Sequence, residues 1–398
     1  MTNKNPYMIL LMAFLVITIG QFACAVYLPS LPAMQQALAT DPLHAQWTYT
    51  FILIAYGGSM FIYGPLSDRF GRKHILLTGM CVFLVGSVIT LFAQDITIML
   101  FARVVQGLGL GSAGLARAIS KDTFDGKAFI KASAYMSMGV AVTPIIAQVI
   151  GGYIETLVGW RGNFVFMLVY AAIIIVCLFF ILPETNRHSS EKKFSAKNMA
   201  QDYVFILNNK AYIGLMICLV LAFAGEMLYT VIAPFLLQGQ LHITPEMYGW
   251  LSVVIIGGYA LGSFISSRLA DKYNVEVLIM LGLSLLLTGS VLMLALSAWL
   301  NTYVIIIPMA IYMVGNSMAL TNAGAAGMML YPKHAGTAGA LQSGLMLMGS
   351  GIVSSAASDF HVNSQLPLAF ALTVLTLAAI VAFYFLVWKN PLCQLREQ

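Results

Sequence analysis

Charged residues are scarce in this sequence of 398 residues, of which only 9% are Asp, Glu, Lys or Arg. About a quarter is typical of a soluble domain. Because 60% of the residues are hydrophobic, a soluble fold of this length would lack the polar groups to cover its surface. The composition excludes that class and indicates a membrane protein with many spans.

Motifs for metal binding, covalent catalysis and nucleotide binding are also missing. The five cysteines lie in apolar segments or near the C-terminal end without ligand spacing, so neither a disulfide framework nor a metal site is predicted. The six histidines fall in loops or near the ends of apolar segments, which argues against an intramembrane enzyme. No GxxxxGK[ST] run occurs that would cradle a phosphate. We therefore expect no cofactor, no enzymatic activity and no ATP-driven engine.

Long apolar segments are abundant. A helix needs about 20 apolar residues to cross a hydrocarbon core of about 30 Å. Twelve segments meet this length: 7–29, 46–66, 75–94, 98–119, 129–154, 162–182, 211–236, 248–269, 277–299, 302–327, 335–358 and 366–388. The sequence predicts an all-α membrane protein with twelve transmembrane helices.

The two halves of the chain repeat one pattern of residue types. Four positions recur 203 residues later at constant spacing: Trp47, Tyr56, Leu66 and Asp68 are followed by Trp250, Tyr259, Leu269 and Asp271. Such a duplication predicts two pseudo-symmetric six-helix bundles, 1–185 and 210–398, joined by a cytoplasmic linker, 186–209. Within the linker, a helix on the membrane surface over about 195–207 and an ordinary solvated connector both remain open. Many secondary transporters carry substrate between two such halves. Since one chain supplies both bundles, we expect a monomer.

Positive residues collect on one side of the predicted spans. All but two of the 20 lysines and arginines fall in the loops and tails on the side of the N-terminus. Positive loops are retained in the cytoplasm, so both termini are predicted to be cytoplasmic. The net charge of +5 is then explained by contact with anionic lipid headgroups and gives no support for nucleic-acid binding.

A charged loop joins the second and third predicted spans. Its sequence, Gly64-Pro65-Leu66-Ser67-Asp68-Arg69-Phe70-Gly71-Arg72-Lys73, places a carboxylate at a helix end beside two arginines. Such a network can break and re-form between two packings. A static loop staple is the alternative. We refer to residues 64–73 as the gate loop, and the candidate gate residues are Gly64, Asp68, Arg69, Gly71, Arg72 and, in the second half, Asp271.

The gate loop resembles the loop signature of the major facilitator superfamily. The run Ser267–Lys272 resembles the degenerate copy that this superfamily carries in its second half, and Arg103–Gly109 resembles the fourth-helix motif of its proton-coupled members. Three further runs, 27–32, 139–152 and 182–185, resemble the twelve-span drug:proton antiporter group. The chain departs from that group at Ala25, where many members have an acid, and at Gln148, where the motif has its second proline.

This resemblance implies a major facilitator fold in a bacterial inner membrane. It also implies proton-coupled export of amphipathic or cationic drugs by alternating access. Because of the two departures, a dedicated siderophore or metabolite exporter, or a solute importer of the same fold, remains open as the alternative. The expected partners are a small-molecule substrate, protons and membrane lipid.

Two ionisable residues inside spans are candidates for proton coupling. Glu226 is the only acid well inside a predicted span, and an apolar environment favours the neutral carboxyl, which can then load and release a proton. Arg103 also lies inside a span, at a cost of about 2.5–3.5 kcal/mol. A glutamate that only packs is the alternative for Glu226. When Pro29 is matched with Pro234, Gln21 occupies the place equivalent to Glu226.

Polar and aromatic residues at similar span depth complete the prediction. Aromatic rings with few charges suit amphipathic or cationic molecules through stacking and cation–π contacts. The predicted substrate-cavity residues are Gln21, Tyr27, Tyr56, Gln148, Tyr229, Tyr259, Asn316, Asn322 and Gln342.

Overall fold

Two compact units of helices follow one another along the chain in the computed structural model: unit 1 is Met1–Ser195 and unit 2 is Ala196–Gln398. The structure describes residues 6–186, 196–332, 335–357 and 364–389. The division between the units falls inside the predicted linker 186–209. Residues 187–195 of that linker and both chain ends, for which a cytoplasmic location is predicted, lie outside the described residues.

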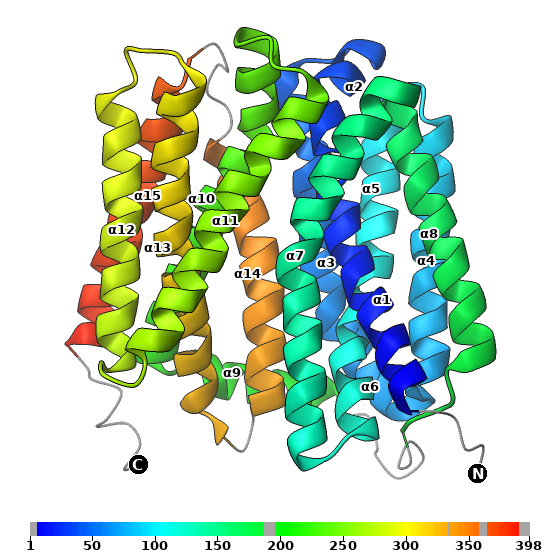
Figure 1. Ribbon diagram of the computed structural model, residues 1–398. Coiled ribbons are helices and arrows are strands. Elements are labelled where there is room, and N and C mark those ends of the chain that lie inside the picture. Colours follow the sequence, from blue (N-terminus) through cyan, green and yellow to red (C-terminus); the bar gives the residue numbers. More distant parts are fainter. Residues whose placement is uncertain (1–5, 187–195, 333–334, 358–363, 390–398) are drawn as a thin grey trace. The chain divides into compact units, whose positions relative to one another are not determined.

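Helices make up most of the described residues of unit 1, and its long helices run alongside one another (Figure 1). Its elements are α1 (Pro6–Ala25), the short 3-10 helix η1 (Leu28–Ser30), α2 (Leu31–Ala37), α3 (Pro42–Phe70), α4 (Arg72–Phe92), α5 (Ile96–Leu110), the 3-10 helix η2 (Gly111–Gly114), α6 (Leu115–Thr123), α7 (Gly126–Val158) and α8 (Trp160–Ile181).

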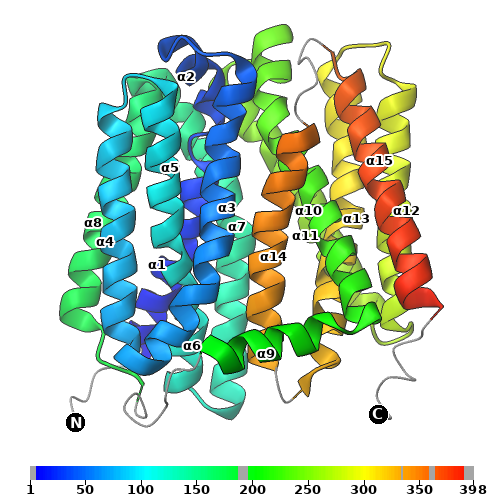
Figure 2. The same ribbon diagram turned by 180° about the vertical axis from the view of Figure 1, so that it is seen from behind.

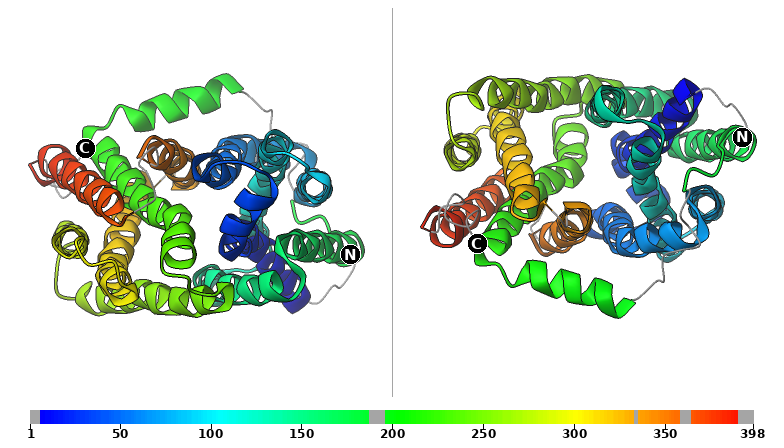
Figure 3. Two further views of the ribbon diagram at one scale, coloured as in Figure 1. Left: turned by 90° about the horizontal axis from the view of Figure 1, so that it is seen from above. Right: turned by 90° about the horizontal axis from the view of Figure 1, so that it is seen from below.

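Unit 2 has the same kind of architecture. Its elements are α9 (Ala196–Leu207), α10 (Lys210–Pro234), the π-helical turn η3 (Phe235–Gln240), α11 (Pro245–Leu269), α12 (Val275–Ala295), α13 (Thr302–Met329), α14 (Ala335–Ala357), α15 (Leu366–Phe383) and the π-helical turn η5 (Tyr384–Trp388). Figure 2 shows α9 lying crosswise to α10 and α14 at one end of the unit, so this part of the predicted linker is a helix. In the end-on views of Figure 3, several long helices, α11 among them, are tilted away from the viewing direction.

The predicted all-α membrane fold is confirmed. Eleven helical stretches in the described part of the chain are long and apolar enough to cross a membrane. α14 has 23 residues, enough to span, but its glycines and serines make it less apolar than the others. With α14, each of the twelve predicted segments corresponds to a helix. The structure also lengthens several of them, α3 among them. The α7 helix continues to Val158 and takes in Glu155, which the sequence places just outside a span.

Equivalent caps start the second long helix of each unit. The Asp41 carboxylate accepts a hydrogen bond from the backbone N–H of His44 at 2.8 Å before α3. Thr244, 203 positions later, does the same for the N–H of Met247 at 3.4 Å before α11. Each cap is followed by a proline at the first helical position, where the missing N–H costs nothing. The duplication visible in the sequence therefore extends to local structure.

Glycines bring two pairs of long helices into close contact. A Cβ on Gly107 of α5 would lie 2.5 Å from the carbonyl oxygen of Ile52 on α3. In unit 2, a Cβ on Gly258 of α11 would lie 2.5 Å from the carbonyl oxygen of Ala310 on α13. Small residues allow such backbone approach inside membranes. This packing carries Arg103 of α5 close to α3.

Candidate functional site

Arg103 lies in the interior of unit 1, where it is 1% exposed. Its guanidinium donates from Nε to the carbonyl oxygen of Thr48 at 3.2 Å and from Nη2 to that of Ala23 at 3.2 Å. Nη1 donates to Oε1 of Gln106 at 2.8 Å, and Gln106 in turn donates to the Ser87 hydroxyl at 3.0 Å. Arg103 therefore ties together α1, α3 and α5 through the rigid fork of donors that only arginine offers.

Aromatic rings complete the surroundings of Arg103. The guanidinium carbon lies 4.0 Å from the centre of the Tyr27 ring and 5.8 Å from that of Phe164. Such cation–π contacts are worth about 2 kcal/mol or more when desolvated. In the part of the chain that the structure describes, Arg103 forms no ion pair. Its charge is thus stabilised by dipoles and rings. The predicted cavity residue Tyr27 is 1% exposed and belongs to this packing.

Glu226 lies on α10 in unit 2 and is partly buried. The amide Nδ2 of Asn316, on α13, donates to its Oε2 atom at 2.6 Å. Asn316 is fully buried, and its own Oδ1 atom has no hydrogen-bond partner among the described residues. In the same part of the chain Glu226 forms no ion pair with a lysine or arginine. The carboxyl group therefore has one firm partner and no fixed counter-charge.

Two tyrosines of unit 2 lie near Glu226, and a serine lies beside one of them. Tyr259 of α11 and Tyr312 of α13 are near enough to the Glu226 carboxyl group to interact with it electrostatically. The Tyr259 hydroxyl also lies near the side chain of Ser317. The Tyr312 hydroxyl lies against Gly225, the residue next to Glu226, and it occupies the space that the Cβ of any other residue at position 225 would need. We refer to Glu226, Asn316, Ser317, Tyr259 and Tyr312 as the acid cluster.

The sequence prediction missed Tyr312 and Ser317. Tyr312 lies one helical turn before Asn316 on α13, so the spacing i, i+4 would have placed both on one face. The predicted residue Tyr229 is buried on α10, and its hydroxyl has no hydrogen-bond partner among the described residues.

The gate loop of unit 1 forms a charge network. Arg72 donates from Nη1 to Oδ1 of Asp68 at 2.6 Å and from Nε to Oδ2 of Asp122, at the end of α6, at 3.1 Å. Nη1 also donates to the Ser67 hydroxyl at 2.5 Å. Asp122 was not predicted, although it follows a predicted span on the same side of the membrane as Arg72. The other predicted arginine, Arg69, is exposed and lies over the Phe70 ring at 5.0 Å.

The chain that leaves α8 holds both helix ends at the gate loop. The Glu184 carboxylate accepts from the backbone N–H groups of Arg72 at 2.8 Å and Lys73 at 3.1 Å, and so caps the start of α4. Asn186 donates to the carbonyl oxygen of Asp68 at 2.9 Å, at the end of α3. Between them stands Gly71 with a φ of 95°, a backbone region that favours glycine. Gly64, by contrast, lies within α3, ahead of this turn.

The copy of the gate loop in unit 2 lacks this network. Asp271 is exposed in the turn after α11 and forms no ion pair in the described residues. The repeated sequence therefore produces two different local structures.

The remaining predicted cavity residues are spread over both units. In unit 1, Gln21 and Tyr56 are partly buried and Gln148 is 9% exposed. In unit 2, Asn322 donates to the Ser266 hydroxyl at 2.7 Å, and Gln342 lies against Gly324. The predicted substrate cavity would take residues from both units. That these residues line one passage therefore stays a prediction.

Known proteins resemble this chain along its whole length. The family model described as Major Facilitator Superfamily matches residues 12–216 and 215–394. A protein named Multidrug resistance protein D, from Escherichia coli, is 26% identical over 96% of each chain. The Bicyclomycin resistance protein homolog of Haemophilus influenzae is 23% identical over 98% of each chain. Among solved structures, a D-xylose-proton symporter superposes with a TM-score of 0.78 at 15% identity, covering 96% of this chain and 98% of that one, which bears on the fold alone.

Proposed function

This chain belongs to the major facilitator superfamily, and we propose that it is a proton-coupled exporter of amphipathic or cationic small molecules. Two relatives matched over nearly their full length are named for resistance to multiple drugs and to bicyclomycin, which supports drug export. We further propose that it works as a monomer in a bacterial inner membrane, with both termini in the cytoplasm. Alternating access between the two units would carry the substrate across.

The hydrogen bond between Asn316 and Glu226 is the observation that carries this proposal. A carboxylate in an apolar span must be protonated, hydrogen-bonded or paired with a cation. Glu226 has a hydrogen-bond donor, and no lysine or arginine among the described residues forms an ion pair with it. Its cationic partner would therefore be one that comes and goes, such as a proton or a cationic substrate. A proton and a cationic substrate would then compete for one carboxylate, which is the requirement for exchange.

Arg103 enters the proposal as a permanent charge in unit 1. Because its donors are committed to carbonyl oxygens and to Gln106, it holds α1, α3 and α5 in place and carries no proton of its own in the cycle. Its role in coupling is therefore to position helices and to set the local field.

For a neutral substrate, the energy supplied by one proton moving down the membrane potential is sufficient for efflux. Moving one charge down about 100 mV releases about 2.3 kcal/mol. At about 1.4 kcal/mol per factor of ten, this supports roughly a fifty-fold gradient of a neutral substrate.

The test is proton flux in energised inverted vesicles that contain the protein. A pH-gradient probe is followed while lipophilic cations and neutral siderophore-like compounds are added to wild type, to Glu226→Gln and to Glu276→Gln. Glu276 lies at the start of α12, away from the acid cluster, and serves as the matched control. We expect substrate-triggered proton release in wild type and Glu276→Gln and none in Glu226→Gln.

Two results would contradict the proposal. Release that survives in Glu226→Gln would remove this residue from coupling. A lack of response to every compound, with the protein shown to be present and folded, would favour a dedicated solute carrier or importer.

A further inference from the structure

Unit 1 contains a partly open cavity of about 250 Å³ bounded by three helices. Phe14 and Phe22 of α1 and Tyr170 of α8 contribute aromatic rings to its wall, and α7 contributes Val142 and its neighbours. No charged side chain is among the lining residues. We refer to this space as the α1/α7/α8 pocket. It shares no residue with the acid cluster, the gate loop or the surroundings of Arg103.

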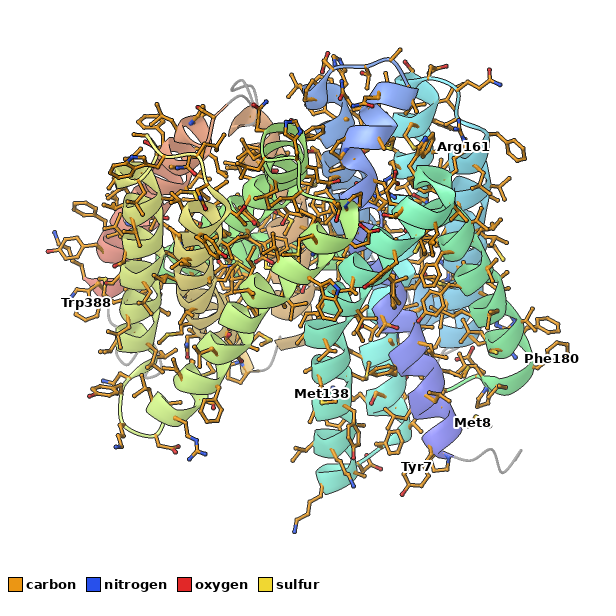
Figure 4. All side chains as sticks on the ribbon, turned by 45° about the horizontal axis from the view of Figure 1, so that its top comes forward. Tyr7, Met8, Met138, Arg161, Phe180 and Trp388 are labelled. Atoms are coloured by element: carbon orange, nitrogen blue, oxygen red, sulfur yellow. The ribbon has the colours of Figure 1, made fainter. Side chains whose placement is uncertain are left out.

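One wall of the pocket reaches the surface of the protein. Along α7, Met138 is 64% exposed and Ile146 is 46% exposed, and both line the pocket. Figure 4 labels Met138 on α7 together with Tyr7 and Met8 at the start of α1. Exposed apolar side chains continue along α7 and α8, as at Leu157 and Val169. Such an apolar surface is suited to contact with lipid, which would give a molecule dissolved in the hydrocarbon region access to the pocket.

The aromatic wall is preformed. The ring centres of Phe22 and Tyr170 are 5.3 Å apart in an edge-to-face arrangement, and Phe166 lies 5.5 Å from Phe22 and 6.1 Å from Tyr170. Phe14 packs against Gly139, where a Cβ would lie 2.3 Å from its ring. Rings held at these separations offer faces and edges to another ring without reorganisation.

A pair of hydroxyl groups in the pocket wall has spare hydrogen-bonding capacity. The Thr18 and Tyr170 oxygens are 2.8 Å apart, and they lie 3.0 Å and 3.2 Å from the carbonyl oxygen of Leu15. Each hydroxyl has a single hydrogen, and these partners use both of them. The phenolic oxygen still has a lone pair that can accept. The pocket therefore favours a ligand that donates one hydrogen bond.

The size of the pocket limits the ligand. An apolar cavity of about 150 Å³ is enough for benzene, and drug-sized ligands occupy roughly 300–1,000 Å³. At about 250 Å³, the pocket fits a molecule of one or two rings. An acyl chain has no hydrogen to donate and gains nothing from ring edges, so it matches these walls less well.

We propose that the α1/α7/α8 pocket binds a compact aromatic molecule that is dissolved in the bilayer and donates one hydrogen bond, such as a phenol, to the Thr18–Tyr170 hydroxyl pair. This binding site is separate from the acid cluster and does not depend on the proposed proton coupling.

Photolabelling of the full chain tests the site. The protein in phosphatidylcholine nanodiscs is irradiated with a phenol that carries a diazirine, with and without excess unlabelled phenol, and the labelled peptides are identified by mass spectrometry. The same experiment is run with Val142→Trp, which fills the pocket, and with the double variant Thr18→Val/Tyr170→Phe, which keeps its shape. Val176→Trp, on the exposed apolar face of α8 outside the pocket, is the matched control.

We expect saturable labelling of α1, α7 and α8 in wild type and Val176→Trp. Val142→Trp should abolish it, and the double variant should raise the half-saturating phenol concentration about three- to tenfold, the size expected for one neutral hydrogen bond. Non-saturable labelling spread over both units would mean partitioning into lipid and would overturn the proposal. So would saturable labelling of these helices by a diazirine fatty acid and not by the phenol.

Discussion

Unit 1 buries a cation and unit 2 buries an acid, and the two are held in different ways. Arg103 has all its described hydrogen bonds directed to fixed groups, among them the backbone carbonyls of Thr48 and Ala23. Glu226 has one amide donor from Asn316 and is only partly buried. A charge whose three nitrogens are each hydrogen-bonded to a fixed group is a structural element. A carboxyl group with one partner retains the freedom to change its protonation state.

The duplicated sequence shows that these groups diverged on a common scaffold. At the repeat distance of 203, the position equivalent to Arg103 is Ile306 in α13, a buried apolar residue. Gln21, the residue matched to Glu226, is neutral. Arg103 and Glu226 are therefore each matched by a neutral side chain in the other unit. The comparison teaches that the two halves share helices and caps but differ in their chemistry.

The largest effect is expected from weakening the cation. Arg103→Lys places a single ammonium group where a fork reaches Thr48, Ala23 and Gln106 together, and it loses the planar contact with the ring. Because hydrogen bonds to charged groups are worth about 1.5–3 kcal/mol each, we expect transport to fall at least about tenfold and the thermal unfolding temperature to drop. Proton flux and differential scanning fluorimetry measure both. Arg117→Lys, at an exposed position of α6, is the control and should match wild type. If Arg103→Lys also matched wild type, the hydrogen bonds of Arg103 would not be needed to hold unit 1 together.

A second prediction compares two asparagines of α13. Asn316→Leu removes the donor to the Glu226 carboxyl, whereas Asn322→Leu removes a bond to the neutral Ser266 hydroxyl. A hydrogen bond to a charged group is worth about 1.5–3 kcal/mol, and one between neutral groups about 0.5–1.5 kcal/mol. We therefore expect transport to fall about ten- to a hundredfold for Asn316→Leu and less than about tenfold for Asn322→Leu. Initial rates in the vesicle assay distinguish them. Equal losses of transport in the two variants would mean that the hydrogen bond from Asn316 to the Glu226 carboxyl is worth no more than a neutral one.

A third prediction concerns the gate loop, which is ordered by capping only in unit 1. Gly71→Ala forces a side chain into a φ of 95° and onto the Glu184 carboxylate, so we expect a loss of about 1–3 kcal/mol in the free energy of unfolding. Gly64→Ala lies in helical α3 with open space around its Cβ, and we expect no loss. Chemical denaturation of both variants in detergent is the measurement. A Gly71→Ala protein as stable as Gly64→Ala would show that the cap from Glu184 does not hold the loop.

The smallest effect is expected at the equivalent caps of α3 and α11. Asp41→Ala removes a bond of 2.8 Å and should cost about 1 kcal/mol, while Thr244→Ala removes a longer bond of 3.4 Å and should cost about 0.5 kcal/mol, the lower end of the range for lost caps. The backbone N–H of His44 lowers the pKa of the Asp41 carboxyl below its ordinary value. A lowered pKa means that the cap stabilises fully above about pH 3.9 and is lost as the pH falls through the folded value.

Unfolding of these cap variants at neutral and acidic pH makes the comparison. The difference in the free energy of unfolding between wild type and Asp41→Ala should shrink at acidic pH. The difference between wild type and Thr244→Ala should stay constant. A pH-independent cost for Asp41→Ala would contradict the role given to its charge.

Much of the fold was predictable because its signals are local. A run of about 20 apolar residues specifies a membrane helix wherever it stands in the chain, and a charge inside such a run is visible at once. The α-helical class, the twelve segments and the two buried ionisable residues followed from this. Glu155 escaped because its position depends on where α7 ends, four residues beyond the predicted limit.

The partners of those residues were not predictable from one sequence. Asn316 was expected to line a substrate cavity, and it is instead the hydrogen-bond donor to an acid 90 positions away. Asp122 joins Arg72 across 50 positions, and Glu184 reaches the same loop across 112. No local pattern links such pairs, because each depends on how α3, α4, α6 and α8, or α10 and α13, pack side by side.

The sequence by itself determined that this chain is a membrane protein of duplicated six-helix halves, with an arginine and a glutamate inside its spans, because the cost of transferring each residue to lipid is a local property. The tertiary structure decided that each nitrogen of the arginine is hydrogen-bonded to a fixed group, that the glutamate has one hydrogen-bond donor, and that a pocket with aromatic rings in its wall lies between α1, α7 and α8. Those outcomes depend on packing between helices, and packing brings together groups that the chain keeps far apart.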